Sequence, residues 1–123
     1  MSKKILIVDD DTGIMVALKF LLEQNGYDTL IAFSGEDAME VVERHHPDLI
    51  LCDITMPGMD GLQVLEQIRA NPATAAIPFV FLTARAEGEL REILKRAGAD
   101  DYLAKPFTLE QLHGVIERNL PES

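Results

Sequence analysis

Short apolar segments alternate along this chain with longer segments whose apolar residues recur at helical spacing. The apolar segments cover residues 5–8, 29–33, 49–52, 79–82 and 102–104. Each is followed by a helical pattern, such as that of Ile14, Leu18 and Leu22. Strict alternation of strand and helix predicts a parallel sheet covered by helices on both faces. The strands are apolar throughout rather than at every second residue, which also indicates that both faces of the sheet are buried.

Turn and capping residues divide this pattern into five strand–helix units. Ser34, Asp60 and Thr108 are typical N-cap residues, and Gln111 completes a capping box with Thr108. Gly98 is expected to end the fourth helix. Because crossovers between parallel strands are right-handed, few topologies remain for five units. We therefore expect an α/β fold: a flavodoxin-like, doubly wound, five-stranded parallel sheet in the order 2-1-3-4-5 with five helices.

The length and charge of the chain restrict what it can bind. Its 123 residues are expected to form one domain over residues 1–123. A net charge of −10 argues against direct binding to nucleic acid or anionic lipid, and no apolar run approaches the roughly 20 residues that span a bilayer. We find no signal-peptide cleavage site, and the single cysteine, Cys52, excludes an intrachain disulfide. A cytoplasmic location is expected.

Polar or charged residues follow four of the five predicted strands. Asp9 and Asp10 follow the first strand, Asp53 the third, Thr83 the fourth and Lys105 the fifth. Because the carboxyl ends of parallel strands meet at one edge of a sheet, and doubly wound folds place their sites there, these side chains are expected to lie together. A further acidic pair at residues 100–101 precedes the fifth strand, so we expect it at the opposite edge, in a solvated turn.

The predicted cluster limits the chemistry that it can support. Three neighbouring carboxylates stay ionised only if positive charge lies among them. Lys105 can offset one charge, and Mg²⁺ is the expected further cation because it prefers oxygen ligands and retains several waters. Asp10 and Asp53 are the predicted direct carboxylate ligands, with Asp9 acting partly through water. A carboxylate, a metal ion, a lysine and a hydroxyl are the components of phosphoryl transfer, whereas the glycine-rich loop of P-loop nucleotide sites is absent.

Four segments of the chain together resemble the receiver domain of response regulators in two-component signalling. They are ILIVDDD at residues 5–11, DLILCDITMPGMDG at 48–61, FVFLTAR at 79–85 and GADDYLAKPF at 98–107. The resemblance extends over essentially all 123 residues. It implies a single-domain phosphoacceptor similar to chemotaxis regulators, which catalyses its own phosphorylation and dephosphorylation and turns over no independent substrate.

The resemblance also implies a role for each matching position. Asp53 would accept the phosphoryl group, Asp9 and Asp10 would hold the metal with Asp53, and the backbone carbonyl of Thr55 would be a further ligand. Lys105 would pair with a phosphoryl oxygen, and its bond to Pro106 would be cis. Thr83 and Tyr102 would be the switch residues, while Thr55 and Arg85 would tune the lifetime of the phosphorylated state. The expected cofactor is Mg²⁺, with Mn²⁺ as a substitute.

The partners implied by this resemblance are proteins. A histidine kinase or a histidine phosphotransfer protein would supply the phosphoryl group. The switched surface would comprise the last two helices and the fifth strand, which would act on a downstream protein target or on an output domain that this sequence lacks. Either a monomer or a phosphorylation-dependent dimer is compatible with the sequence.

Two other functions are compatible with parts of the sequence. Asp9-Asp10-Asp11-Thr12 resembles the DxD motif of haloacid-dehalogenase-type phosphatases, in which Asp9 would be the nucleophile and Asp11 the acid/base. However, no acidic pair follows Lys105, and the chain has no room for the usual cap domain. A purely structural binding module is the third alternative, and it predicts that Mg²⁺ has no effect on stability.

Overall fold

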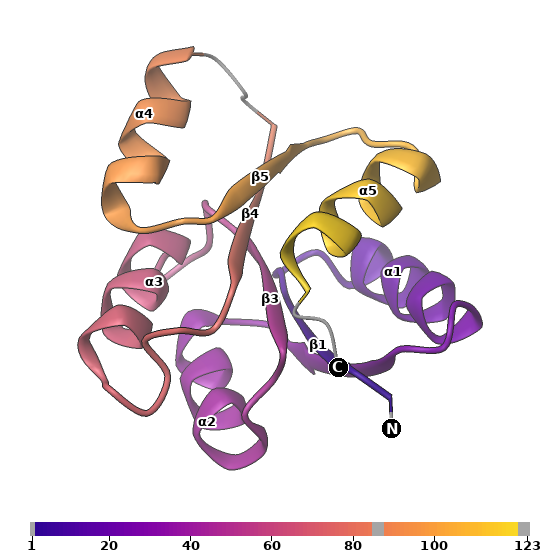
Figure 1. The fold of residues 1–123 in the computed structure, drawn as a ribbon, viewed down its shortest axis with the longest axis horizontal. Helices are drawn as coiled ribbons and strands as arrows, with labels where there is room; N and C mark the ends of the chain where they lie inside the picture. Colours follow the sequence, from indigo (N-terminus) through magenta and orange to yellow (C-terminus); the bar gives the residue numbers. More distant parts are fainter. Residues whose placement is uncertain (1, 85–87, 121–123) are drawn as a thin grey trace.

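The computed structural model describes residues 2–84 and 88–120, which form an alternating series of five strands and five helices (Figure 1). The strands are β1 (Lys4–Val8), β2 (Asp28–Ala32), β3 (Leu49–Asp53), β4 (Phe79–Thr83) and β5 (Asp101–Ala104). The helices are α1 (Thr12–Gln24), α2 (Gly35–His45), α3 (Gly61–Ala70), α4 (Gly88–Ala97) and α5 (Leu109–Asn119).

The five strands form one sheet in the order β2-β1-β3-β4-β5, and every neighbouring pair is parallel. This confirms the predicted flavodoxin-like, doubly wound topology. Some strand limits differ from the sequence pattern. Phe33 lies beyond the end of β2 with 47% of its surface exposed, whereas Asp53 and Thr83 are the last residues of β3 and β4 rather than the residues after them. The two polar side chains are therefore fixed by the sheet itself.

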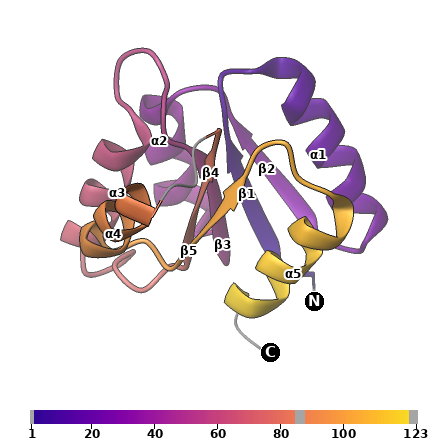
Figure 2. The same ribbon diagram turned by 90° about the horizontal axis from the view of Figure 1, so that it is seen from above.

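The sheet separates two apolar cores, and successive strand residues alternate between them (Figure 2). Leu6 and Val8 of β1 pack with the helices α2, α3 and α4 on one face. Ile5 and Ile7 pack with α1 and α5 on the other. Because both faces are covered, the strands are apolar at every position, as the sequence indicated.

Side-chain N-caps fix the first residues of four helices, and so fix where the preceding loops end. Ser34 Oγ accepts a hydrogen bond from the Asp37 N–H at the start of α2. Capping boxes begin α3 at Asp60 and α5 at Thr108. The sequence predicted the box at Thr108, and at Asp60 it predicted only the N-cap. Asp11 caps α1 by accepting from the N–H groups of Gly13 and Ile14, a role that the sequence analysis did not assign to it.

Helix α4 is attached to the rest of the fold less extensively than the sequence pattern suggested. Leu94 is its only buried residue among those whose burial is described. Ile93, although apolar, is 49% exposed. Helix α4 lies beside the margin of the sheet near β5 (Figure 1), and Leu94 is its buried contribution to the core shared with α2 and α3.

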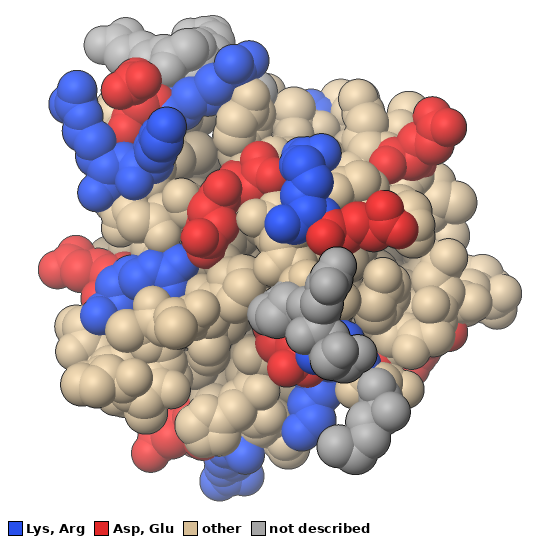
Figure 3. All heavy atoms as spheres, in the orientation of Figure 1, with Lys and Arg blue, Asp and Glu red and all other residues tan. Residues whose placement is uncertain are grey.

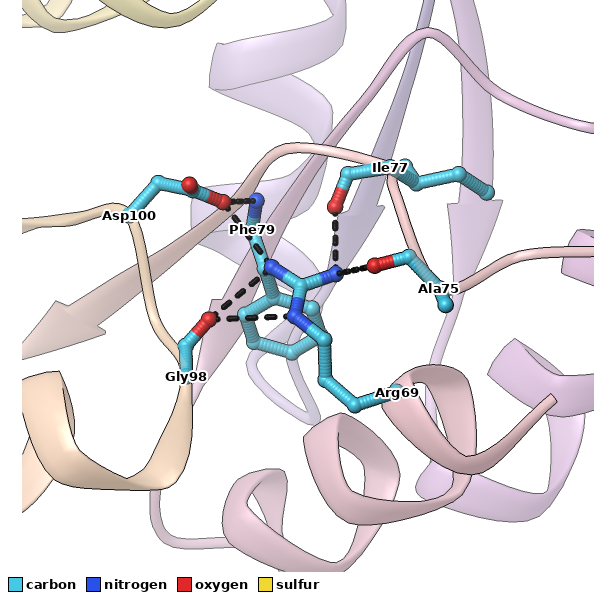
Figure 4. A network of polar contacts seen from close by, with 6 residues as sticks. All are labelled: Arg69, Ala75, Ile77, Phe79, Gly98 and Asp100. Atoms are coloured by element: carbon cyan, nitrogen blue, oxygen red, sulfur yellow. Dashed lines mark hydrogen bonds and ion pairs between the residues drawn. The ribbon is translucent and has the colours of Figure 1, made fainter. Parts of the chain in front are cut away.

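Arg69, in the last turn of α3, forms a polar network that joins α3 to the end of α4 (Figure 4). Its guanidinium donates to the carbonyls of Ala75, Ile77 and Gly98, and lies 2.9 Å from Asp100 Oδ2. The same Asp100 oxygen accepts from the Phe79 N–H at 2.8 Å. Asp100 is exposed, as predicted for a solvated turn, but its carboxylate is also part of a structural network that the sequence did not indicate.

Its neighbour Asp101 also has structural partners rather than only water. Asp101 is the first residue of β5, and its carboxylate accepts hydrogen bonds from Arg118 and Asn119 of α5. Both carboxylates lie where basic or amide side chains of neighbouring helices reach the sheet, and such contacts between distant segments have no local sequence signal.

The surface is mixed in charge despite the net charge of −10. Figure 3 shows acidic and basic side chains on one face, with basic side chains gathered over α4, where Arg91, Lys95 and Arg96 are all exposed. Within the described part of the chain, every helix is too short or too polar to cross a membrane.

Candidate functional site

Three carboxylates lie together at the carboxyl edge of the sheet. Asp9 and Asp10 directly follow β1, and Asp53 ends the neighbouring strand β3. One carboxylate oxygen from each lies within 4.8 Å of the others, and this is a group of acidic side chains that could hold a metal ion. The order of the strands produces this proximity because β1 and β3 pair directly, with Val8 opposite Cys52. The structure thus brings together the three acids that the sequence placed at this edge.

The three carboxylates have different surroundings. Asp9 is fully buried, and both of its oxygens have partners: Oδ1 accepts from the Asp11 N–H at 3.0 Å and Oδ2 from Lys105 Nζ at 2.8 Å. Asp10 is exposed, and Asp53 is half-buried. Asp10 and Asp53 therefore offer the more accessible oxygens of the three acids.

Lys105, which follows the marginal strand β5, contacts two of the acids. Its Nζ lies 2.8 Å from Asp9 Oδ2 and 3.6 Å from Asp53 Oδ2. Burial by itself would lower the pKa of Lys105, but the hydrogen bond to Asp9 and the charge of Asp53 outweigh burial and raise it. The backbone N–H of Lys105 donates to the backbone carbonyl of Thr83 at 2.7 Å. The Lys105–Pro106 peptide bond is cis, as expected. The lysine is therefore held charged at the site.

The pKa of Asp53 is raised above its ordinary value. Burial is the largest cause, and the charge of Asp9 acts in the same direction. The charge of Lys105 and hydrogen bonds from the backbone N–H groups of Thr55 and Ile54 oppose the rise without cancelling it. A carboxylate whose ionised form is disfavoured in this way would be stabilised by an added cation.

A cleft opens beside Asp53. Its volume is about 400 Å³, and it is lined by Asp53, Ile54, Thr55, Thr83, Ala84, Leu90 and Lys105. Thr83 is 5% exposed and Thr55 is exposed. Four of the predicted site residues therefore line one cleft, and Leu90 of α4 forms part of its wall. A rearrangement of the side chains that line the cleft would therefore act directly on α4.

The two remaining predicted residues have different outcomes. Tyr102 of β5 lies outside the residues that line the cleft; its half-buried ring packs against the guanidinium of Arg91, 5.2 Å from the ring centroid. It is nevertheless on the strand next to Thr83, since Phe81 of β4 is paired with it. Arg85 falls outside the described residues.

The donor atoms at this edge suit a small, hard cation. The group offers carboxylate oxygens only, with no histidine nitrogen and no cysteine sulfur among its ligand atoms. Mg²⁺ takes oxygen ligands and keeps several waters, so two accessible carboxylates on an open cleft match its requirements. Cys52, although adjacent to Asp53, is fully buried, and burial raises the pKa of its thiol. It is a packing residue of the core and has no place among the ligands.

Residues 5–117 match the sequence model of the response regulator receiver domain. The chain belongs to this family. It is 37% identical over 123 residues to the alkaline phosphatase synthesis transcriptional regulatory protein PhoP of Bacillus subtilis. The match covers 100% of this chain and 50% of that protein, so the receiver spans half the length of this curated relative.

Solved structures support the same assignment. The chemotaxis protein CheY4 of Vibrio cholerae superposes with a TM-score of 0.93 at 29% identity, over 98% of this chain and 100% of that one. The receiver domain of the sensor histidine kinase PA1611 from Pseudomonas aeruginosa has a TM-score of 0.87 at 33% identity, over 96% and 97% of the two chains. That structure has a magnesium ion coordinated in its active-site cleft.

Membership of the receiver family makes the chain a component of two-component signalling rather than a conventional enzyme. The phosphatase alternative is therefore wrong, and local geometry gives the reason. Asp11, its would-be acid/base, is occupied as the N-cap of α1. Asp9, its would-be nucleophile, is fully buried with both oxygens hydrogen-bonded.

Sequence reasoning missed the residues that shape the backbone around the receiver site. Gly61 begins α3 so close to the end of β3 that a Cβ there would overlap the backbone oxygen of Asp53. A single sequence does not show which glycines are needed for close packing. Only the three-dimensional contact distinguishes Gly61 from an ordinary helix start.

Proposed function

We propose that this receiver accepts a phosphoryl group on Asp53 from the phosphohistidine of a histidine kinase or a histidine phosphotransfer protein, in a reaction that requires Mg²⁺. One observation carries the proposal: carboxylate oxygens of Asp9, Asp10 and Asp53 lie within 4.8 Å of one another, with Lys105 Nζ 3.6 Å from Asp53, in an open cleft. The histidine-containing partner is of the kind with which receiver domains interact.

Four residues would hold the metal ion. Asp10 and Asp53 would supply carboxylate oxygens, Thr55 its backbone carbonyl, and Asp9 an oxygen acting partly through water. When bound, Mg²⁺ (or Mn²⁺ as a substitute) neutralises negative charge that would otherwise repel an incoming phosphoryl group. The protein's own contribution is to hold these acids close together beside the charge of Lys105, whose Nζ lies 2.8 Å from Asp9 Oδ2.

In the transfer step, a carboxylate oxygen of Asp53 attacks phosphorus in line with the bond to the donor imidazole. A P–O bond forms, the P–N bond breaks, and its electron pair stays on the imidazole nitrogen. Lys105 is placed to compensate charge on a phosphoryl oxygen. The product is an acyl phosphate, which water hydrolyses, and Thr55 and Arg85 would tune its lifetime. The receiver would thereby catalyse its own phosphorylation and dephosphorylation without turning over another substrate.

Phosphorylation would then change the conformation of the surface through movements of Thr83 and Tyr102. The Thr83 hydroxyl would move toward the new phosphoryl oxygens, and Tyr102 would fill the space that it leaves. Because Leu90 of α4 lines the same cleft, the shift would alter the surface of α4, β5 and α5. A downstream protein target or an output domain would respond, with the receiver acting as a monomer or a phosphorylation-dependent dimer.

We further propose that residues 1–123 act as one receiver domain in the cytoplasm, without direct contact to nucleic acid or membrane.

The test is intact-protein mass spectrometry after incubation with acetyl phosphate, with and without Mg²⁺. We expect one added phosphoryl group per chain only when Mg²⁺ is present, and none in Asp53→Asn. Retained labelling of Asp53→Asn, or labelling that is equal after chelation with EDTA, would refute the proposal. Asp101→Asn is a matched control because Asp101 lies at the opposite edge of the sheet, and it should be labelled like the wild type.

A further inference from the structure

The loop between β3 and α3, residues 54–60, is closed tightly at its base. It leaves β3 directly after Asp53 and carries Thr55, whose N–H donates to the Asp53 carboxylate. The Gly61 N–H donates to the Ile54 carbonyl at 2.8 Å. A side chain at Gly61 would overlap Asp53 and also lie 2.9 Å from the Cα of Ile54. The base of the loop therefore has one close-packed arrangement.

The tip of the same loop is held by the first turn of α2, which belongs to a different strand–helix unit. Gly35 is buried, and a Cβ on it would lie 2.6 Å from the backbone oxygen of Met59 and 2.8 Å from its Cβ. Glu36 Oε1 accepts a hydrogen bond from the Met59 N–H at 3.3 Å. The other Glu36 oxygen, Oε2, approaches Gly58, which has a φ of +75°. The backbone of Gly35 thus packs on the backbone of Met59, and the Glu36 carboxylate adds a hydrogen bond to the same residue.

These contacts leave the position of Thr55 determined from both ends. Thr55 lies between the base at Ile54 and the tip at Met59, and the loop has few residues with which to absorb a displacement. Mg²⁺ tolerates little departure from octahedral geometry, and groups that orient its ligands influence affinity strongly. A displacement of the loop tip would therefore shift the backbone around Thr55.

We propose that Gly35 and Glu36 are positioning residues for the metal site: by docking against Met59 they fix the β3–α3 loop and so set the affinity for Mg²⁺. Neither residue is among those that line the cleft. The inference rests on the proposed function, because it presumes that the Thr55 carbonyl binds the metal. It adds that the second strand–helix unit, which contributes no ligand, takes part in metal binding.

The test is isothermal titration of the metal-free protein with MgCl₂, at a temperature where circular dichroism shows every variant folded. We expect Gly35→Ala to weaken Mg²⁺ binding about ten-fold, because its Cβ forces Met59 to move. Val115→Ala is the control. Val115 is a buried residue of α5 on the other face of the sheet, so this variant loses stability without touching the loop and should bind Mg²⁺ like the wild type.

A second pair of variants separates positioning from charge. Glu36→Gln keeps an oxygen that can accept from the Met59 N–H, and should bind Mg²⁺ nearly as well as the wild type. Glu36→Ala removes the acceptor and should bind it several-fold more weakly. If Gly35→Ala does not fold, this pair decides the matter.

Three outcomes would overturn the inference: wild-type affinity in Gly35→Ala or Glu36→Ala, an equal loss in Val115→Ala, or equal losses in Glu36→Gln and Glu36→Ala, which would indicate a charge effect. Failure of the proposed function is distinguishable from these, because the wild-type protein itself would then bind no Mg²⁺.

Discussion

At the scale of single residues, the environment of Asp53 determines how the metal-free protein responds to pH. Burial, together with the charge of Asp9, raises the pKa of Asp53 above its ordinary value of 3.8. In the unfolded chain this shift is absent, so the folded protein binds a proton at Asp53 more readily than the unfolded one. Ionisation of Asp53 therefore costs stability at neutral pH, and the cost disappears as the pH falls through the folded and then the unfolded pKa.

Asp53→Asn should consequently be more stable than the wild type in the absence of metal. The asparagine has no charge to desolvate and does not repel Asp9. The difference in unfolding free energy should be largest above the folded-state pKa of Asp53 and should vanish below pH 3.8. Urea unfolding in EDTA at several pH values measures it. A variant that is less stable than the wild type at pH 7 would contradict the assignment of burial as the main cause.

Lys105 presents the opposite case, because its removal leaves a buried charge without a partner. The Asp9 side chain is 1% exposed, and Lys105 Nζ is its only cationic partner among the described residues. Lys105→Met should destabilise the metal-free protein by about 3 kcal/mol, and part of this loss should be recovered on adding Mg²⁺. Lys95→Met is the control. Lys95 is exposed on α4, so urea unfolding should show a change within about 0.5 kcal/mol.

At the scale of elements, α4 depends on a contact outside itself. Its apolar attachment is narrow, with Leu94 as its one buried residue where burial is described. Arg69 of α3 hydrogen-bonds the Gly98 carbonyl with two nitrogens at the end of the helix (Figure 4). The beginning of α4, by contrast, leads to Leu90 at the cleft. One end of the helix is thus fixed by polar contacts, and the other is in contact with the candidate site.

Arg69→Met should therefore loosen α4 selectively. The substitution leaves the carbonyls of Ala75, Ile77 and Gly98 without their donors, and we expect a loss of about 3 kcal/mol in unfolding free energy. Amide hydrogen exchange should accelerate most in α4 and in the 71–78 connection.

Arg118→Met is the matched control for Arg69→Met. The guanidinium of Arg118 also pairs with an aspartate, Asp101, but its side chain is 62% exposed, so removal should cost less than about 1 kcal/mol. Uniform acceleration of exchange over the whole molecule in Arg69→Met, or equal effects of the two substitutions, would contradict this account of α4.

The order of the strands and the convergence of the acids could be predicted from the sequence because both follow from local patterns. Continuous apolar strands, caps such as Ser34 and Asp60, and the polar residues at four of the five strand ends are visible within a few residues. Contacts between distant segments are different. Asp100 pairs with Arg69 across 31 positions, and Gly35 packs on Met59 across the sheet edge. Neither leaves a local signal, so the sequence placed Asp100 in solvent and was silent on Gly35.

At the scale of the whole molecule, metal binding should be visible as global stability. The chain carries a net charge of −10, so any salt will reduce its self-repulsion, and this general effect must be separated from occupancy of a site. A ligand that binds only the folded state stabilises it by about 2.7 kcal/mol when its free concentration is about 100 times the dissociation constant. MgCl₂ should therefore raise the thermal midpoint well beyond NaCl of equal ionic strength.

The same comparison in Asp10→Asn isolates the site. Asp10 is exposed and has an oxygen in the acidic group, so the substitution should leave the fold intact while removing one ligand. The response to NaCl should persist in this variant because screening acts on the whole charge distribution, whereas the additional response to MgCl₂ should largely disappear. If MgCl₂ and NaCl act equally on the wild type, the acids at the sheet edge hold no ion, and the chain would behave as the purely structural binding module considered above.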